Sequence, residues 1–210
     1  SSLVSSNSIW RACFGAFELD KMGAPSHASW ADVLVRAELQ DMGISADGLF
    51  PFSWPSAVIS EKHFVIGATK IGFLWEFPAM SSAMDGNGSG VMFFELTFCD
   101  NAMHIDNPKR GGTLVHGGAP AAVIDAFAAA CAFMLLGNLN IATVTQNFTY
   151  HAPMFVGKKY LVIARSDAGE SGNSSTTRVV NTKILAEDAR RCVSCTSILK
   201  IPKGFAASKL

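Results

Sequence analysis

The segment over residues 119–136 carries a single charged side chain, Asp125, among alanines and large apolar residues. Pro120 suits the first turn of a helix, where the N–H that proline lacks would have had no partner. A helix that is apolar on all sides is buried in a protein core or in a membrane. The charge of Asp125 and the Gly137-Asn138 pair that follows favour a core helix over a membrane span. The chain is therefore expected to fold around this helix.

Asp125 needs an explanation, because an ionised carboxylate is costly to remove from water and is seldom buried without a partner. Either a backbone N–H or an arginine satisfies it, or it acts in chemistry. The segment His116-Gly117-Gly118 precedes the helix. Backbone N–H groups at a helix N-terminus favour negative charge, and glycine has no Cβ to block an approaching carbonyl group. The turn therefore suits stabilisation of an oxyanion, although two glycines also fit a tight turn with no such role.

The rest of the chain after residue 63 has mainly the pattern of strands. Aromatic and β-branched residues predict strands over 64–77 and 91–99, joined by a polar turn over 81–90. Four further strands are predicted after the helix, over residues 141–150, 160–166, 176–186 and 192–201. One buried helix among such strands predicts an α+β domain, in which the helix packs across a curved antiparallel sheet.

The first sixty residues differ in composition. Residues 1–25 are rich in serine, glycine and other small residues and predict a loose arm. A helix is expected from Ser29 to Met42, ended by Gly43 in the left-handed conformation. Its expected packing face consists of Trp30, Val33, Leu34, Ala37 and Met42. We therefore divide the chain into an arm and helix over 1–62, a main domain over 63–203 and a tail over 204–210.

The charges cancel, with 17 lysines and arginines against 17 aspartates and glutamates, so nothing indicates a nucleic-acid-binding surface. Apolar residues make up 49% of the chain and charged residues only 16%. Because so few charges cannot cover a monomer, a homo-oligomer is expected.

The five cysteines form an odd set without a disulfide framework, which favours an intracellular compartment, cytoplasmic or mitochondrial. Cys192 and Cys195 have the spacing of a metal or redox pair. However, positions i and i+3 of a strand face opposite sides of a sheet, so this pair is not expected to bind one ion. No other metal-ligand spacing is present, and no metal site is predicted.

Two motifs are similar to those of a known family. The first motif consists of His116-Gly117-Gly118, six further residues and then Asp125 on an alanine-rich helix. It resembles the hotdog-fold acyl-CoA thioesterases of the phenylacetate-degradation type. The resemblance is to the branch that contains the animal thioesterase-superfamily proteins. The family's next strand ends in Tyr-x-x-Pro and carries Ser or Thr seven residues before the tyrosine; here these residues are Tyr150, Pro153 and Thr143. The resemblance implies a hotdog fold and an enzyme of lipid metabolism that hydrolyses acyl-CoA without a cofactor.

The resemblance also implies a role for each matched residue. Asp125 would be a general base acting on water, or the nucleophile itself, and the N–H of Gly117 would be the oxyanion donor. The family's acid and glycine donor come from different subunits, which implies a homodimer, alone or doubled to a tetramer. Thr143 would hold the water or orient the carboxylate, although it equally suits a plain strand position. His116 would bond the thioester carbonyl or brace the turn, and Gly118 would line the substrate site.

The resemblance, which covers roughly residues 64–202, departs from the family before the turn. Members of the animal branch often have an asparagine there that contacts the substrate carbonyl. Here residues 107–112 contain an extra residue, and Asn107 does not fall at that place. Lys109 and Arg110 either face the phosphates of coenzyme A or lie in a solvated basic loop.

Three other classes of function fit the sequence less well. One is a hotdog hydratase or dehydratase, whose acid and histidine stand in different local contexts from those of this chain. A serine hydrolase is not supported, because no G-x-S-x-G motif occurs. The alternative is a non-catalytic hotdog protein that binds acyl-CoA as a sensor or scaffold. The combination of Asp125 with Thr143 favours the enzyme, and the sequence does not name the acyl group.

Overall fold

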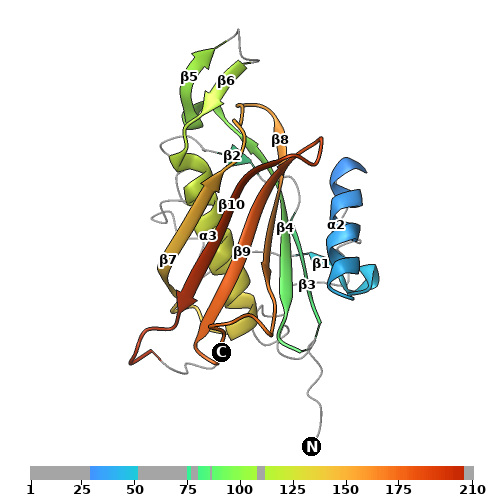
Figure 1. Cartoon of the computed structure of the whole chain (residues 1–210), viewed down its shortest axis with the longest axis vertical. Coiled ribbons are helices and arrows are strands. Elements are labelled where there is room, and N and C mark those ends of the chain that lie inside the picture. Colours follow the sequence, from blue (N-terminus) through green and yellow to red (C-terminus); the bar gives the residue numbers. More distant parts are fainter. Residues whose placement is uncertain (1–28, 52–74, 77–79, 86, 108–111, 206–210) are drawn as a thin grey trace, which may run out of the picture.

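The main feature of the fold is one antiparallel sheet with a helix on each face. The computed structural model describes residues 29–51, 75–76, 80–85, 87–107 and 112–205. Within these residues the sheet has eight strands in the order β1-β3-β4-β8-β9-β10-β7, and β2 pairs with the far end of β4. The strands are β1 (Phe50–Pro51), β2 (Trp75–Glu76), β3 (Met80–Met84), β4 (Gly90–Phe98), β7 (Ala142–Tyr150), β8 (Lys159–Ser166), β9 (Thr177–Ala186) and β10 (Arg191–Lys200) (Figure 1). A separate hairpin and two short 3-10 helices complete the elements: β5 (Met103–Asn107), β6 (Gly112–Val115), η2 (Ala46–Gly48) and η3 (Asp100–Ala102).

Helix α3 (Gly118–Leu136) crosses one face of this sheet, as the sequence predicts (Figure 1). It ends at Gly137, which has a φ of 62° and donates its N–H to the Phe133 carbonyl at 2.8 Å. Phe127 stacks on Phe94 of β4 with ring centroids 3.7 Å apart. The helix is long and apolar enough to cross a membrane, but two thirds of it is buried inside the structure. Its packing is that of a core helix.

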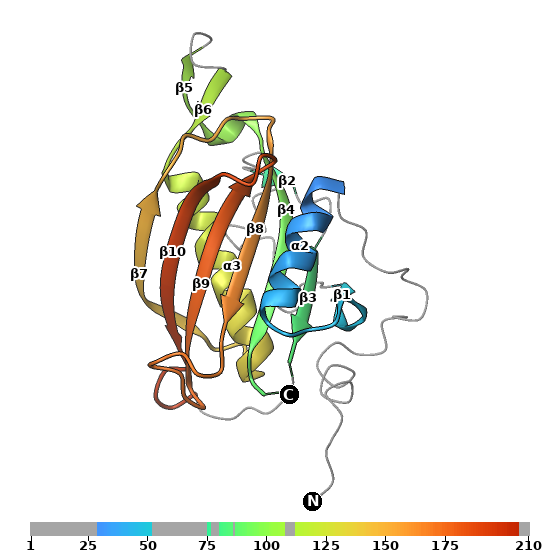
Figure 2. The ribbon, with the colours of Figure 1, turned by 45° about the vertical axis from the view of Figure 1, so that its right-hand side comes forward.

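Helix α2 (Ser29–Asp41) covers the opposite face of the sheet, over β3, β4 and β8 (Figure 2). In β4, Phe93 packs toward α2 and Phe94 toward α3. A strand covered on both faces can be almost continuously apolar, which explains the run of buried residues in β4. The packing face predicted for α2 is partly wrong. Ala31, Val35 and Leu39 are buried, whereas Val33 is 67% exposed and Ala37 also faces solvent.

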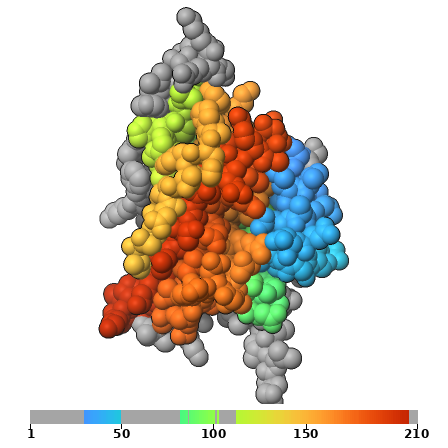
Figure 3. Space-filling view, in the orientation of Figure 1, coloured from blue at the N-terminus to red at the C-terminus, as the bar shows by residue number. Residues whose placement is uncertain are grey.

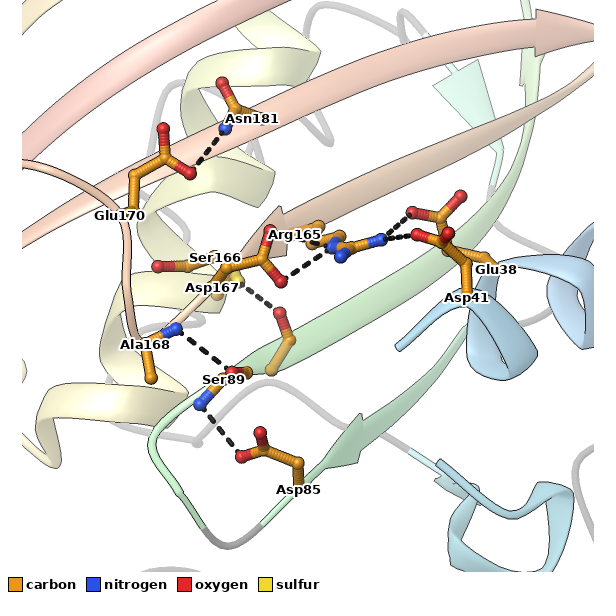
Figure 4. A network of polar contacts seen from close by, with 12 residues as sticks. Glu38, Asp41, Asp85, Ser89, Arg165, Ser166, Asp167, Ala168, Glu170 and Asn181 are labelled. Carbon is orange, nitrogen blue, oxygen red and sulfur yellow. Dashed lines mark hydrogen bonds and ion pairs between the residues drawn. The ribbon is translucent and has the colours of Figure 1, made fainter. Parts of the chain in front are cut away.

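Ion pairs explain why α2 is rotated from the predicted orientation (Figure 4). Arg165 of β8 contacts Glu38 at 3.2 Å, Asp41 at 2.5 Å and Asp167 at 2.8 Å. The second oxygen of Glu38 contacts Lys183 at 2.5 Å. The guanidinium of Arg165 lowers the pKa of Asp41. Because Glu38 has these partners on the sheet, it lies on the buried side of the helix, where a pattern of apolar residues would not place it.

Two further predictions about strands can be compared with the structure. The polar turn expected over 81–90 is shorter, because β3 extends to Met84 and pairs with β4. The turn begins at Asp85, whose carboxylate accepts the N–H groups of Asn87 at 2.7 Å and Ser89 at 3.0 Å. The strand expected over 64–77 lies outside the described residues except for β2. The helix boundary at Gly43, with a φ of 68°, and the strands β7 to β10 are confirmed.

Candidate active site

The turn that leads into α3 is held by its own hydrogen bonds. The N–H of His116 donates to the Ala102 carbonyl at 2.7 Å, and the carbonyl of His116 accepts the N–H of Ala119 at 2.9 Å. The N–H of Gly118 donates to Nδ1 of the His116 ring at 3.0 Å. The neutral imidazole therefore carries its proton on Nε2. The resemblance implied that His116 either bonds the thioester carbonyl or braces the turn, and the hydrogen bond from Gly118 is of the second kind.

The N–H group of Gly117 differs from those of its neighbours in its hydrogen bonding. Among the N–H groups of His116, Gly117 and Gly118, only that of Gly117 has no acceptor within the described part of the chain. Gly117 has a φ of −57° and a ψ of −25°, and it caps the N-terminus of α3. A donor at this end of a helix is reinforced by the helix dipole. Gly117, and not Gly118, is therefore the available donor in this turn.

Asp125 lies on α3, partly exposed, and accepts a hydrogen bond from the Thr143 hydroxyl at 2.8 Å. The contact that the family resemblance implies for these two residues is thus present. Neither a lysine nor an arginine of the described residues forms an ion pair with Asp125. An ion pair within the described residues therefore does not account for the charge of Asp125 on this apolar helix.

A β-bulge in β7 gives Thr143 its orientation. Ile198 of β10 pairs with Thr145, and the next residue, Leu199, pairs with Thr143, so Val144 is an extra residue. Residues seven positions apart face opposite sides of a regular strand, yet Thr143 and Tyr150 both face α3, because the bulge reverses the alternation. Bulges next to active sites commonly re-aim a side chain in this way.

Tyr150 is a site residue that the sequence did not single out for a contact of its own. Its hydroxyl donates to the Gly117 carbonyl at 2.8 Å. A Cβ built on Gly117 would lie 3.8 Å from three atoms of the tyrosine side chain, which is ordinary van der Waals contact. Tyr150 thus lies directly beside the turn. The only sequence signal for this contact was the Tyr-x-x-Pro motif.

A pocket of about 330 Å³ opens between this turn and the end of β7. Its walls come from three segments of the chain and expose both polar and apolar atoms. They are Val115, Gly117, Pro120, Tyr150, His151, Ala152, Pro153, Met154 and Val193. A larger cavity of about 410 Å³ lies among Glu38, Arg165, Lys183 and polar residues of β7, β9 and β10. It contains none of the predicted site residues, whereas the smaller pocket is lined by Gly117.

The structure does not test two of the predicted substrate-binding residues. Lys109 and Arg110 are outside the described residues. The expectation that Cys192 and Cys195 face opposite sides of the sheet is wrong, because Cys192 is the extra residue in a bulge between Arg191 and Val193. Both cysteines are buried in the core beside α3, and burial raises the pKa of each thiol. The described residues contain no cluster of three or more potential metal ligands.

Comparison with known proteins adds one family match. A family model described as the thioesterase superfamily matches residues 112–180. The matched segment contains the turn, Asp125 and Thr143, and it continues through β8 into β9. The search of curated proteins gave no match.

Solved structures with a similar arrangement include several named thioesterases. The Lactococcus lactis protein yhdA, provisionally named a thioesterase, is 13% identical with a TM-score of 0.49, covering 61% of this chain and 94% of its own. Zebra fish thioesterase superfamily member 2 is 16% identical with a TM-score of 0.47, covering 67% and 86%. A hypothetical thioesterase from Streptococcus pneumoniae, solved with coenzyme A, is 16% identical with a TM-score of 0.42, covering 60% and 87%. The fold of this chain is the predicted α+β hotdog arrangement, one long helix across an antiparallel sheet, with an added N-terminal helix.

Proposed function

We propose that this protein is an acyl-CoA thioesterase of the phenylacetate-degradation type, which hydrolyses a thioester to a free acid and coenzyme A. The observation that carries the proposal is the N–H of Gly117, which has no acceptor among the described residues, at the start of the helix whose Asp125 accepts the Thr143 hydroxyl. The thioesterase-superfamily match over the same segment supports it.

The chemistry follows from these two groups. Attack on a thioester carbonyl places negative charge on its oxygen, and a donor aimed at that oxygen contributes a few kcal/mol to the transition state. The Gly117 N–H supplies this donor. Asp125 accepts a proton from water as the water oxygen bonds to the carbonyl carbon, or itself attacks the carbon to form an acyl-aspartyl anhydride, which water hydrolyses after coenzyme A has left. The carbon–sulfur bond then breaks and coenzyme A leaves as the thiolate. The Thr143 hydroxyl, which bonds one carboxylate oxygen, orients the other toward the reaction.

The spacing along α3 requires two subunits. Asp125 lies eight positions after Gly117. At 1.5 Å per residue this places the acid about 12 Å along the helix from the donor, which is too far for both to reach one carbonyl group. A complete site therefore takes Gly117 from one subunit and Asp125 from its partner.

Strand β7 offers the surface for such a dimer. It lies at the end of the sheet order, with no strand on its outer side among the described residues. The space-filling view shows it at the margin of the molecule beside β10 (Figure 3). Its nine residues include neither a charge nor a proline, the usual protections of an exposed edge. An unprotected edge of this length suits pairing with a second copy of the chain.

The test is hydrolysis of a panel of aliphatic and aromatic acyl-CoA thioesters, with free coenzyme A measured by chromatography. We expect turnover by the wild type and a loss of at least about 100-fold in Asp125→Asn, because the amide cannot accept the proton. Asp188→Asn, a matched change in the exposed β9–β10 turn, is the control. Tight binding of acyl-CoA without hydrolysis would instead indicate the sensor or scaffold, and an active Asp125→Asn variant would refute the role of Asp125.

A further inference from the structure

The end of β7 is fixed to β10 by two backbone hydrogen bonds that share one acceptor. Directly after Tyr150, the N–H groups of His151 and Ala152 both donate to the Cys192 carbonyl, at 2.8 and 3.2 Å. Cys192 is the bulged residue of β10, so its carbonyl is displaced from the regular ladder. Two successive donors on one carbonyl fix the position of the backbone at Tyr150.

The same segment also holds the strand that leads into the turn. The N–H of Val115 donates to the Met154 carbonyl at 2.9 Å, immediately before His116. The turn is therefore hydrogen-bonded on two sides, by the loop after β7 through Met154 and by the hydroxyl of Tyr150. The ring of Tyr150 lies near that of Phe148, with centroids 6.3 Å apart and planes 23° from parallel.

The peptide between Gly117 and Gly118 is held at both of its polar atoms. Its carbonyl oxygen accepts the Tyr150 hydroxyl at 2.8 Å, and its N–H donates to His116 Nδ1 at 3.0 Å. In the preceding peptide, the His116 carbonyl accepts the N–H of Ala119 at 2.9 Å, and the Gly117 N–H has no acceptor among the described residues. Rotation of the preceding peptide would turn the Gly117 N–H, and the fixed Gly117–Gly118 peptide restricts that rotation because the two peptides share the Gly117 Cα.

We propose that Tyr150 is a positioning residue, whose hydroxyl fixes the Gly117–Gly118 peptide and so aims the Gly117 N–H at the thioester carbonyl. This inference rests on the proposed function. Burial raises the pKa of Tyr150, so the phenol stays protonated and able to donate through the neutral range. Because the hydroxyl acts through the donor, its effect falls on the transition state, where charge develops on the carbonyl oxygen, more than on ground-state binding.

The chain provides a matched control, since it contains two tyrosines. The hydroxyl of Tyr160 also bonds backbone, accepting from the Phe155 N–H at 2.7 Å and donating to its carbonyl at 3.3 Å. Tyr160 is 2% exposed in the core. Tyr160→Phe therefore removes the same group from a purely structural position.

The experiment compares Tyr150→Phe and Tyr160→Phe in the full chain. For Tyr150→Phe we expect kcat to fall between about 10- and 100-fold, the scale of a misplaced catalytic group, with KM within about twofold. Tyr160→Phe should lower the melting temperature and leave kcat unchanged. In the double variant Gly117→Ala/Tyr150→Phe, the loss should be about that of the worse single change, because both act on one donor. A Tyr150→Phe variant with wild-type kcat, or a loss confined to melting temperature, would overturn the inference.

Amide hydrogen exchange separates this inference from the proposed function. The Gly118 N–H should exchange at least about tenfold faster in Tyr150→Phe than in the wild type, and unchanged in Tyr160→Phe, because only the first variant frees the peptide. A wild type that hydrolyses no thioester would refute the proposed function alone. Equal exchange in all three proteins would show that the hydroxyl does not fix the turn, whatever the activity.

Discussion

Gly117 and Gly118 are neighbours with different amounts of space around them. A Cβ at Gly117 would meet the Tyr150 side chain at 3.8 Å, and its φ of −57° suits any residue. A Cβ at Gly118 would lie 3.1 Å from His116 Nδ1, so the ring would have to move. The requirement for glycine at 117 is therefore not conformational, whereas at 118 it is steric.

These differences predict opposite outcomes for two alanine variants. Gly117→Ala should fold with a melting temperature near that of the wild type, while turnover falls about 100-fold because the methyl group narrows the approach to the N–H. Gly118→Ala should lower the melting temperature, because the ring of His116 is displaced and its bond to the turn is lost. Thermal denaturation and kcat per folded molecule check both. A Gly117→Ala variant that is less stable but fully active would show that Gly117 serves only the structure of the turn and that its N–H is not the oxyanion donor.

At the scale of elements, the extra residue Val144 allows Thr143 to face Asp125 although Thr143 lies seven positions before Tyr150. Exchanging the two residues, as Thr143→Val with Val144→Thr, keeps the composition but moves the hydroxyl to the bulge. We expect turnover to fall about tenfold or more, as the carboxylate loses its orienting bond. Because Val144 is 62% exposed, little stability should be lost.

Deletion of Val144 is the matched control for this exchange. Without the extra residue, β7 becomes regular, Thr143 still pairs with Leu199, and its side chain stays on the α3 face. Turnover should therefore remain within about tenfold of the wild type. An inactive deletion together with an active exchanged variant would show that Thr143 is a plain strand residue.

The sequence predicted those elements whose pattern is strong on its own. The apolar run of α3 and the strands β7 to β10, separated by clear turns, lie within one residue of the expected bounds. Strand β3 was missed because Ser81 and Ser82 resemble turn residues, although Ser82 is fully buried. The face of α2 was misplaced because ion pairs with the distant residues Arg165 and Lys183 hold Glu38 on the side of the helix that faces the sheet. The bond from Tyr150 to Gly117 depends on a bulge and on tertiary packing, neither of which has a local pattern.

At the scale of the whole molecule, the separation of Gly117 from Asp125 predicts that the smallest active unit is a homodimer. The low charge content and the uncharged edge of β7 are consistent with a covered surface. Light scattering at concentrations where the enzyme is active should give a dimer or a tetramer. A monomer with full activity would contradict the divided site.

Mixed dimers test the division of the site directly. Asp125→Asn and Gly117→Ala are each expected to lose about 100-fold in activity alone, but a dimer of one with the other has one site with both groups intact and one site with neither. Co-expression should therefore restore about a quarter of wild-type activity, because random pairing makes half of the dimers mixed and one of their two sites is complete. The doubly substituted chain co-expressed with Asp125→Asn provides the control, since none of its pairings rebuilds a site. If each subunit held a complete site of its own, every site would lack one group and mixing would restore nothing.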